Sequence, residues 1–384
     1  MRASLAQSLR ERLYAPVVLP CCCLVLVGLL VLWSAGKGGG PLPIDDWHVR
    51  QLTAVAVGLV VGAVLLLVPF KRLVAHAYLL YWVNVFLLVL VLLVAPLRKG
   101  TQRWINLLGF DLQPSEYMKL TLVVTLARYI RFRSSYKTFK GLGAPFLLTL
   151  LPMALVLKQP DLGTAILLIP ILFTMLFVAG ARLRHLATIV LLGALAMVPV
   201  YTLGLQPYQK ERIQAFVRQL PGVPEAVDEH HAASSGYQLL RSKAAVGSGG
   251  VFGVGLGSAG ENAAGQVPER HTDFIFAVLA HEWGLFGGVV LLALWTLVLV
   301  AILQVALRQR DPAGRLLCVG VFALFGAQAF INIAMTVGLM PVTGLTLPFV
   351  SYGRSSLVVS LAAVALVCNV ATRPSYEFGR GDFR

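Results

Sequence analysis

The amino-acid sequence predicts an all-α integral membrane protein, with about ten transmembrane helices in a single membrane domain that covers residues 1–384. Of the 384 residues, 58% are hydrophobic and only 13% are charged. The mean hydropathy is +0.79. The apolar residues gather in long runs, which the core of a water-soluble protein does not need. This composition is typical of a polytopic membrane protein.

Ten apolar runs are candidate spans, because a helix needs about 20 apolar residues to cross the hydrocarbon core. They are Val17–Ala35, Leu52–Phe70, Leu73–Pro96, Ser115–Ile130, Leu142–Leu157, Leu162–Gly180, Leu186–Leu205, Phe274–Leu307, Leu316–Val337 and Ser355–Ala371. The first is long enough to span and is followed by no small-residue cleavage site, so we do not expect a signal peptide. The eighth is too long for one crossing, and Gly284, Gly287 and Gly288 predict a bend within it.

The basic residues predict the orientation of these spans. Most of them flank the spans on one side, which by the positive-inside rule is the cytoplasm, and both termini lie on that side. These residues are Arg2, Arg10, Arg12, Lys71, Arg72, Arg131, Arg133, Lys137, Lys140, Arg182, Arg184, Arg308, Arg310, Arg315, Arg373, Arg380 and Arg384. The net charge of +15 therefore reflects topology. Binding to nucleic acid is not expected, because it would need basic residues gathered on one soluble face.

The positions of the acidic residues and of the cysteines indicate which chemistry to expect and on which side of the membrane. All acids except Glu11, Asp311, Glu377 and Asp382 map to the outer loops or to the spans near them, so we expect polar chemistry near the outer leaflet. The five cysteines map to the spans and predict neither a disulfide framework nor a zinc site.

One predicted outer loop, residues 206–272, is much longer than the others. It begins with the helix-compatible stretch Tyr208–Leu220, passes a Pro221-Gly222 turn and the acidic stretch Glu225–His231, and ends in the glycine-rich segment Gly247–Gly257. This segment lacks the lysine and the flanking strand of a phosphate-binding loop, so nucleotide binding is not expected. We predict a close-packed loop over an outward cavity.

Two outward segments carry ionisable groups at the edges of spans. In Arg103–Lys119, Ser115 is a candidate helix N-cap, and Glu116 and Lys119 are spaced to pair on one helix face. A structural ion pair and a substrate-binding role are equally compatible with that spacing. In Lys158–Ala165, Asp161 is a second candidate cap at the outer end of a span.

A third outward segment, Gly338–Ser356, contains two prolines and several glycines in an apolar setting. Such a segment cannot form a simple helix, and its backbone groups must be satisfied within protein or a cavity. It predicts a re-entrant-like outer loop before the last helix.

Four motifs in these segments together resemble the SEDS family (shape, elongation, division and sporulation). They are Arg103-Trp104-Ile105 with Gln113-Pro114-Ser115-Glu116, then Gln159–Ala165, then Glu269–Ala277, and finally Pro341–Gly344 with Leu347–Gly353. The resemblance extends from the first span to the last. The sequence of Glu269–Asp273 is more similar to the elongation branch of the family than to the division branch.

The resemblance implies a peptidoglycan glycosyltransferase of the bacterial cytoplasmic (inner) membrane, acting in cell elongation and shape. It would polymerise lipid II, the undecaprenyl-pyrophosphate-linked disaccharide peptide, at the outer face, beside a class B penicillin-binding protein. The family's aspartate falls on Asp273, the candidate general base, and its buried acid–lysine pair falls on Glu116 and Lys119. The remaining candidate substrate-binding residues are Arg103, Trp104, Gln113, Ser115, Gln159, Asp161, Glu269, Arg270, His271, Thr272, Ser351, Arg354 and Ser355.

Two questions about this site remain open at the level of sequence. Asp273 also fits an ordinary acid at a helix N-terminus. The pyrophosphate leaving group needs positive charge or a metal ion. Basic side chains on the outer side can supply the charge, and a divalent cation, Mg²⁺ or Mn²⁺, is the alternative. The candidate side chains are Arg103, Lys119, Arg241, Arg270 and Arg354.

The sequence departs from the family pattern at His281, Arg354 and Val254, where an acid, a glycine and a lysine are usual. Glu282 is nine residues beyond Asp273, on roughly the opposite face of a regular helix, so we do not expect it to share the proton transfer. Two other functions are compatible with the sequence. One is a lipid II flippase, which would need polar groups across the whole bilayer. The other is a noncatalytic scaffold that activates a penicillin-binding protein.

Overall fold

The computed structural model describes residues 13–37, 46–95, 103–107, 110–133, 135–199, 201–202, 207–218, 235–258 and 263–373. Each of the ten predicted spans corresponds to helix. The helices are α2 (Ala15–Gly36), α3 (Trp47–Leu67), α5 (Ala77–Val94), α6 (Pro114–Arg131), α7 (Gly143–Lys158), α8 (Leu162–Ala179), α9 (Leu183–Pro199), α12 (Ile275–Arg308), α13 (Pro312–Thr336) and α14 (Arg354–Ala371). Within the described ranges, eight helices are long and apolar enough to cross a membrane. The prediction of an all-α, multi-pass membrane protein is confirmed.

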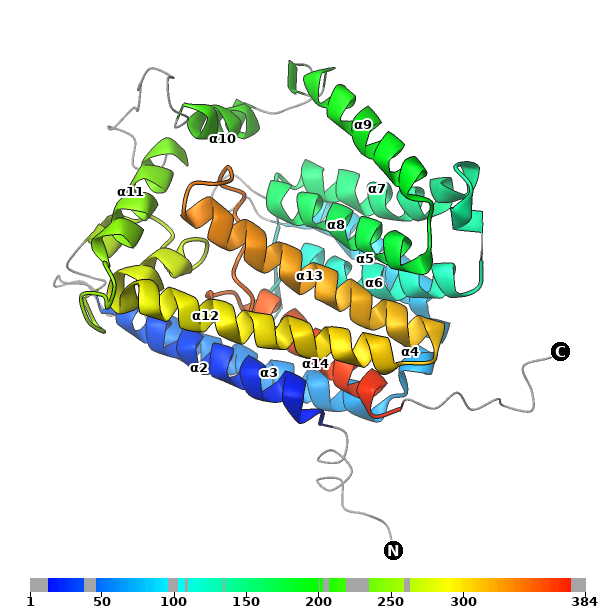
Figure 1. Ribbon diagram of the computed structural model, residues 1–384, viewed down its shortest axis with the longest axis horizontal. Helices are drawn as coiled ribbons and strands as arrows, with labels where there is room; N and C mark the ends of the chain where they lie inside the picture. Colours follow the sequence, from blue (N-terminus) through cyan, green and yellow to red (C-terminus); the bar gives the residue numbers. More distant parts are fainter. Residues whose placement is uncertain are drawn as a thin grey trace, which may run out of the picture.

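The two remaining helices differ from these eight for physical reasons. The helix α6 carries four charged residues, Glu116, Lys119, Arg128 and Arg131. The apolar part of α9 is shorter than the others. Both lie beside the long helices, with α9 running at an angle to them (Figure 1).

Two local features were not predicted. The third run is divided at His76 into α4 (Phe70–Ala75) and α5, because the amide of His76 bonds back to Arg72 and Leu73 and closes the first helix. Strands β1 (Ile105–Leu107) and β2 (Phe110–Leu112) pair in an antiparallel hairpin before α6. Three residues per strand are too few for a recognisable alternation of apolar and polar residues.

The helices pack side by side with their long axes roughly parallel (Figure 1). The helix α14 packs on α3, α12 packs on α2 and α13, and α13 also packs on α6 and α8. The helices α13 and α14 are buried over most of their length, whereas only 28% of the apolar stretches of α3 and of α7 is buried. Exposed side chains such as Leu59, Val60 and Leu93 are apolar, as expected for surfaces that face lipid.

The helix α12 is interrupted at Gly284, where the sequence predicts a bend. Gly284 has φ 64° and ψ −161°, far from helical values. The glycine-rich segment, residues 247–257, closes the gap by exchanging backbone hydrogen bonds with both sides of it. These bonds are Val254 N to His281 O (3.1 Å), Gly255 N to Glu282 O (3.1 Å), Leu285 N to Gly250 O (2.9 Å) and Phe286 N to Val251 O (3.0 Å). These four backbone groups of α12 at the break therefore have partners within the protein instead of water or lipid.

Replacing Gly253 by alanine should destabilise this closure. A Cβ at Gly253 would lie 2.0 Å from the carbonyl oxygen of Glu282, and its φ of +81° disfavours any other residue. The conformation alone costs about 1–3 kcal/mol, and the clash adds to it. The midpoint of thermal unfolding in detergent should fall by several degrees. Gly247→Ala is the matched control, because nothing lies within 4 Å of its Cβ position. Equal midpoints for the two variants would contradict the closure.

The predicted re-entrant-like loop connects α13 to α14 through residues 338–353, which contain no helix. Its side chains Val342, Leu345 and Leu347 are buried. Its backbone is held by two polar residues of α13. Gln328 Nε2 donates to Thr346 O at 2.8 Å, and Asn332 Nδ2 donates to Leu345 O at 2.6 Å. These two loop carbonyls are thus satisfied within protein, as the sequence predicts.

The long segment between α9 and α12 contains two helices at one end of the bundle, α10 (Pro207–Val217) and α11 (Ser235–Ser248) (Figure 1). The first agrees with the predicted helical stretch Tyr208–Leu220, and the second was not predicted. The Pro221-Gly222 turn and the acidic stretch Glu225–His231 lie outside the described residues. The placement of this segment outside the cell stays a prediction.

Cysteine labelling should test that orientation. In a variant whose five cysteines are replaced by alanine, Val217→Cys should react with an impermeant thiol reagent on intact spheroplasts. Thr138→Cys should react only after the membrane is permeabilised. Both side chains are exposed, so accessibility to the reagent depends on the side of the membrane. Reversed labelling would overturn the orientation and an outer site with it.

Candidate active site

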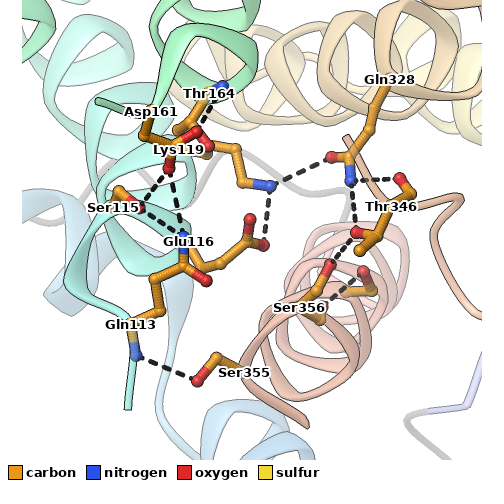
Figure 2. A network of polar contacts seen from close by, with 11 residues as sticks. Gln113, Ser115, Glu116, Lys119, Asp161, Thr164, Gln328, Thr346, Ser355 and Ser356 are labelled. Atoms are coloured by element: carbon orange, nitrogen blue, oxygen red, sulfur yellow. Dashed lines mark hydrogen bonds and ion pairs between the residues drawn. The ribbon is translucent and has the colours of Figure 1, made fainter. Parts of the chain in front are cut away.

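A buried ion pair lies near the start of α6. Lys119 Nζ is 2.7 Å from Glu116 Oε2 and donates to Gln328 Oε1 at 3.1 Å. Only 1% of the Lys119 side chain is exposed. The spacing of three residues brings the two groups to one helix face, as the sequence predicts. Figure 2 shows the lysine ammonium between the glutamate of its own helix and the amide of α13.

The ion pair is connected to the re-entrant-like loop and to α14. Gln328, which accepts from Lys119, donates through Nε2 to the carbonyl of Thr346. The hydroxyl of Thr346 lies 3.0 Å from that of Ser356. Charged groups buried in this way are stable only when further hydrogen bonds satisfy them. The network therefore fixes the loop relative to α6 and α13 (Figure 2).

Asp161 joins α8 to the segment before α6. Its carboxylate caps α8 by accepting from Thr164 N at 3.3 Å, as predicted. It also accepts from Ser115 Oγ at 3.1 Å and from Gln113 Nε2 at 3.2 Å. The prediction that Ser115 caps α6 is wrong. Gln113 is the N-cap residue, Pro114 begins the helix, and the Ser115 hydroxyl turns sideways to Asp161.

Arg103 approaches the same carboxylate. Its Nη1 lies 3.9 Å from Asp161 Oδ1, while Nε donates to Gln159 O at 2.9 Å. The side chain of Gln159 points elsewhere, since its Nε2 donates to Leu88 O on α5. Gln159 thus positions Arg103 through its backbone and anchors the turn. Trp104 is half-buried in the same segment.

Asp273 lies just before Phe274, the N-cap residue of α12, and only part of it is exposed. Its carbonyl oxygen accepts from Asn332 Nδ2 at 2.9 Å. Its carboxylate faces the loop, because Oδ2 is 3.5 Å from the point where a Cβ on Gly344 would lie. The guanidinium of Arg212 is 3.7 Å from that same point. The absent side chain of Gly344 leaves room for both groups.

The surroundings of Asp273 change its acidity. Burial raises the pKa of its carboxyl to about 6, and the negative charge of Glu269 contributes in the same direction. The positive charges of Arg212 and Arg103 act in the opposite sense. At neutral pH the carboxylate is mostly ionised and is a better proton acceptor than an ordinary aspartate. These are the properties of a general base.

The residues before Asp273 are tied to their surroundings. Glu269 has a φ of +52°, and its Oε2 accepts from Thr272 Oγ1 at 3.1 Å. His271 stacks on Trp47 with ring centroids 4.0 Å apart, and its carbonyl accepts from Tyr352 N at 2.8 Å. These contacts join the segment to α3 and to the loop before α14.

The remaining predicted residues connect the loop to β2 and shape it. Arg354 Nη2 lies 2.5 Å from Asp111 Oδ2, and Ser355 Oγ donates to Asp111 O at 2.7 Å. The hydroxyl of Ser351 accepts from the amide of Leu347 and so closes a turn within the loop. Arg270 donates to the carbonyl of Gly265.

The four predicted segments thus come together at one end of the bundle. Residues 103–119 contact residues 159–161 and α14, while residues 269–273 contact α13 and the loop. The sequence analysis did not single out Gln328, Asn332 or Arg212, and it named Gly344 only as the end of the motif Pro341–Gly344. A signal for the first two was present, because they are amides four residues apart on one face of an apolar span. Arg241 is not part of this network and lies over the ring of Tyr237.

Glu282 and His281 belong to the break in α12. Glu282 Oε1 accepts from the hydroxyl of Ser34 and from Gly257 N. His281 Nδ1 is 2.7 Å from Ser248 Oγ. Both residues therefore help to hold the glycine-rich segment. Val254, where a lysine is usual in the family, contributes its backbone amide to the bond with His281 O.

A metal site built from protein side chains needs several donor groups in one place. In the part of the chain that the structure describes, no group of three or more His, Cys, Asp or Glu side chains comes together. A divalent cation at the leaving group therefore stays a prediction.

The fold and the site define a class of protein: a polytopic membrane protein with an ionisable centre at one end of its helix bundle, around a carboxylate suited to accept a proton. The family model for FtsW, RodA and SpoVE, described as a cell cycle protein, matches residues 16–376. The chain belongs to this family, which confirms the prediction from its motifs.

Similar proteins occur in several branches of the family. Stage V sporulation protein E of Bacillus subtilis is 34% identical over 92% of this chain and 95% of its own. The peptidoglycan glycosyltransferase MrdB of Escherichia coli is 35% identical over 91% of this chain and 90% of its own.

Solved structures agree with these relatives. A chain in a peptidoglycan synthase complex matches with a TM-score of 0.77 and 32% identity, over 92% of this chain and 96% of that one. Rod shape determining protein RodA of Thermus thermophilus matches with a TM-score of 0.68 and 31% identity, over 95% of this chain and 98% of that one.

Proposed function

We propose that this chain is a peptidoglycan glycosyltransferase that polymerises lipid II at the outer face of the cytoplasmic membrane, with Asp273 as the general base. The observation that carries this proposal is the position of the Asp273 carboxylate, which lies among the four motif segments and has its pKa raised by burial. The names of the E. coli relative and of other relatives as peptidoglycan glycosyltransferases support it.

The reaction requires one proton transfer and one displacement. The 4-hydroxyl of the acceptor sugar gives its proton to Asp273 while its oxygen attacks the anomeric carbon of the donor. The bond from that carbon to the undecaprenyl pyrophosphate breaks, and the pyrophosphate leaves with the electron pair. A correctly placed base contributes roughly 10²–10⁴-fold to such a step. Arg212 and Arg103 are near enough to Asp273 to affect its pKa, so they are the first candidates to stabilise the leaving group.

The lipid substrate sets the shape of the proposed site. Removing its polyprenyl tail from the bilayer would cost about 0.8 kcal/mol per CH₂. The tail must therefore stay in the outer leaflet while the sugars reach Asp273. We place the substrate in a lateral groove whose rim is formed by the four motif segments. On this view the candidate substrate-binding residues act in two ways. Arg103, Arg270 and His271 face the substrate, while Gln113, Ser115, Gln159, Asp161, Ser351 and Ser355 hold the rim in place.

A partner transpeptidase is part of the proposal. The similarity to a chain of a peptidoglycan synthase complex supports assembly with a cross-linking partner, and we propose a class B penicillin-binding protein. Purified protein incubated with labelled lipid II, with and without such a partner, tests the function directly. Glycan strands made by the chain alone would distinguish an enzyme from a scaffold. A flippase would move lipid II without lengthening it.

The pH profile of polymerisation should report the titration of Asp273. A base acts only when deprotonated, so kcat/KM should be low below a pH of about 6 and rise as the pH increases through that value. Glu269→Gln removes a negative charge that raises the pKa, so it should move the rise to lower pH. Arg212→Gln removes a positive charge and should move the rise to higher pH. Strand synthesis measured between pH 5 and 8 checks all three profiles. Shifts in the opposite directions would remove Asp273 from the base role.

A further inference from the structure

The three helices α6, α8 and α13 also form a cavity at the other end of the bundle from Asp273. The cavity has a volume of about 500 Å³ and is lined by the last residues of α6 and α8 and by the first residues of α13. At their opposite ends the same helices carry Glu116, Asp161 and Asn332 of the candidate site. The predicted orientation places the cavity at the cytoplasmic surface of the membrane.

The polar side of this cavity is strongly basic. Arg131, Arg133 and Arg315 line it. Of the acids that the structure describes, one forms an ion pair with them: Asp311, which caps α13, has its Oδ2 3.7 Å from Arg131 Nη2. Among the described residues, Arg133 and Arg315 form no ion pair. Arg133 lies over the ring of Tyr129. Three positive charges against one negative charge leave the cavity able to bind an anion.

The other side of the cavity is apolar. Phe132, Val178 and Leu316 line it, and Tyr136 adds a ring with a polar end. Phe132 is 65% exposed although it is a large hydrophobic residue. A phosphate group alone would fill only a small part of the volume and would leave this wall without a partner. A lipid fits both sides, because its phosphate can bind the arginines while the first part of an acyl chain covers the apolar wall.

We propose that this cavity binds the phosphate headgroup of an anionic glycerophospholipid from the cytoplasmic leaflet. Arginine suits this ligand because its planar guanidinium donates two parallel hydrogen bonds to phosphate. Arg133 follows α6 and Arg315 belongs to the first turn of α13, so one phosphate between them would connect the two helices. The same two helices are joined at their other ends by the contact of Lys119 with Gln328. Bound lipid should therefore stabilise the pair of helices that carries the candidate site.

Lipid titrations of the detergent-purified chain, followed by native mass spectrometry, test the proposal. Phosphatidylglycerol should bind at least tenfold more tightly than phosphatidylcholine, whose headgroup carries no net charge. The double variant Arg133→Gln/Arg315→Gln should lose that preference, with a loss on the order of tenfold or more in affinity for phosphatidylglycerol. Arg72→Gln/Arg308→Gln is the matched control. It removes two exposed arginines from the same predicted side of the membrane, outside the cavity, and should stay within about twofold of the parent chain.

Two further experiments distinguish binding in the cavity from binding at the protein surface, and binding of the lipid from binding of free phosphate. Ala179→Phe keeps every arginine but fills the cavity, so it should also weaken binding of phosphatidylglycerol. Soluble glycerol 3-phosphate should bind far more weakly than the lipid, as measured by the shift in the thermal unfolding midpoint. The proposal fails if phosphatidylcholine binds equally well, or if the control variant loses as much as the cavity variant. It also fails if Ala179→Phe binds normally or glycerol 3-phosphate matches the lipid.

Discussion

Replacing Asp273 by asparagine should lower the rate of lipid II polymerisation by roughly 10²–10⁴-fold. The asparagine side chain keeps the size and shape of aspartate but cannot accept a proton at neutral pH. The backbone bond from Asn332 to the carbonyl of residue 273 does not depend on the side chain, so the fold should be retained. Strand length and yield from labelled lipid II give the measurement, and the thermal unfolding midpoint shows that the variant is folded.

Asp46→Asn provides the matched control for this substitution. Asp46 is an exposed acid that precedes α3, at the same end of the bundle, and its side chain makes no capping bond. The control should polymerise at the parental rate. If Asp273→Asn also made strands at a near-parental rate, another group would have to accept the proton.

Lys119→Ala should be the most destabilising of the single substitutions considered. It leaves the carboxylate of Glu116 buried without its cation, at a cost of roughly 3–5 kcal/mol, and it removes the bond to Gln328. Glu116→Ala should be costly for the corresponding reason. The double variant should be less destabilised than the sum of the two single variants, because it leaves no unpaired charge.

Unfolding midpoints of the four proteins, namely the parent, both single variants and the double variant, complete this cycle. Additive effects would mean that the two groups do not stabilise each other. The cycle also bears on the two interpretations of the pair that the sequence left open. A double variant that is folded but inactive would show a role in the reaction, and one that is folded and active would show a structural pair.

The sequence predicted the spans well because membrane crossing depends on the length and polarity of a run, and both are local properties. The bend at Gly284 was predictable for a similar reason, since a run of that length with three glycines cannot be one straight crossing. The hydrogen bonds that close the gap at this bend could not be predicted from local properties of the sequence. The partners of the broken backbone come from a segment about thirty residues earlier, and only the folded chain brings them together.

The site was predicted as a set of motifs but not as a network. The pairing of Glu116 with Lys119 follows from helical spacing. The turn of Ser115 away from its expected cap to Asp161 depends on where α8 lies. From its position in the sequence alone, the Ser115 hydroxyl could cap α6 or bond to another group. Because Pro114 is the first residue of α6, Ser115 lies inside the helix and is not its cap. Arg212 was missed, and Gly344 was not linked to Asp273, because proximity to Asp273 is a property of the tertiary structure.

The interruption of α12 has a consequence for the biogenesis of the protein. Residues 285–308 alone are long enough to cross a bilayer. The insertion machinery can therefore accept this part as a complete apolar segment, without the residues before Gly284. Those residues, from Ile275 to Glu282, are all buried within the protein. They can join the bundle after insertion, once the glycine-rich segment synthesised before them is in place to receive them. Because this part of α12 joins the bundle late and is surrounded by protein, it can contain His281 and Glu282. A helix that inserts while facing lipid would have to exclude such ionisable residues.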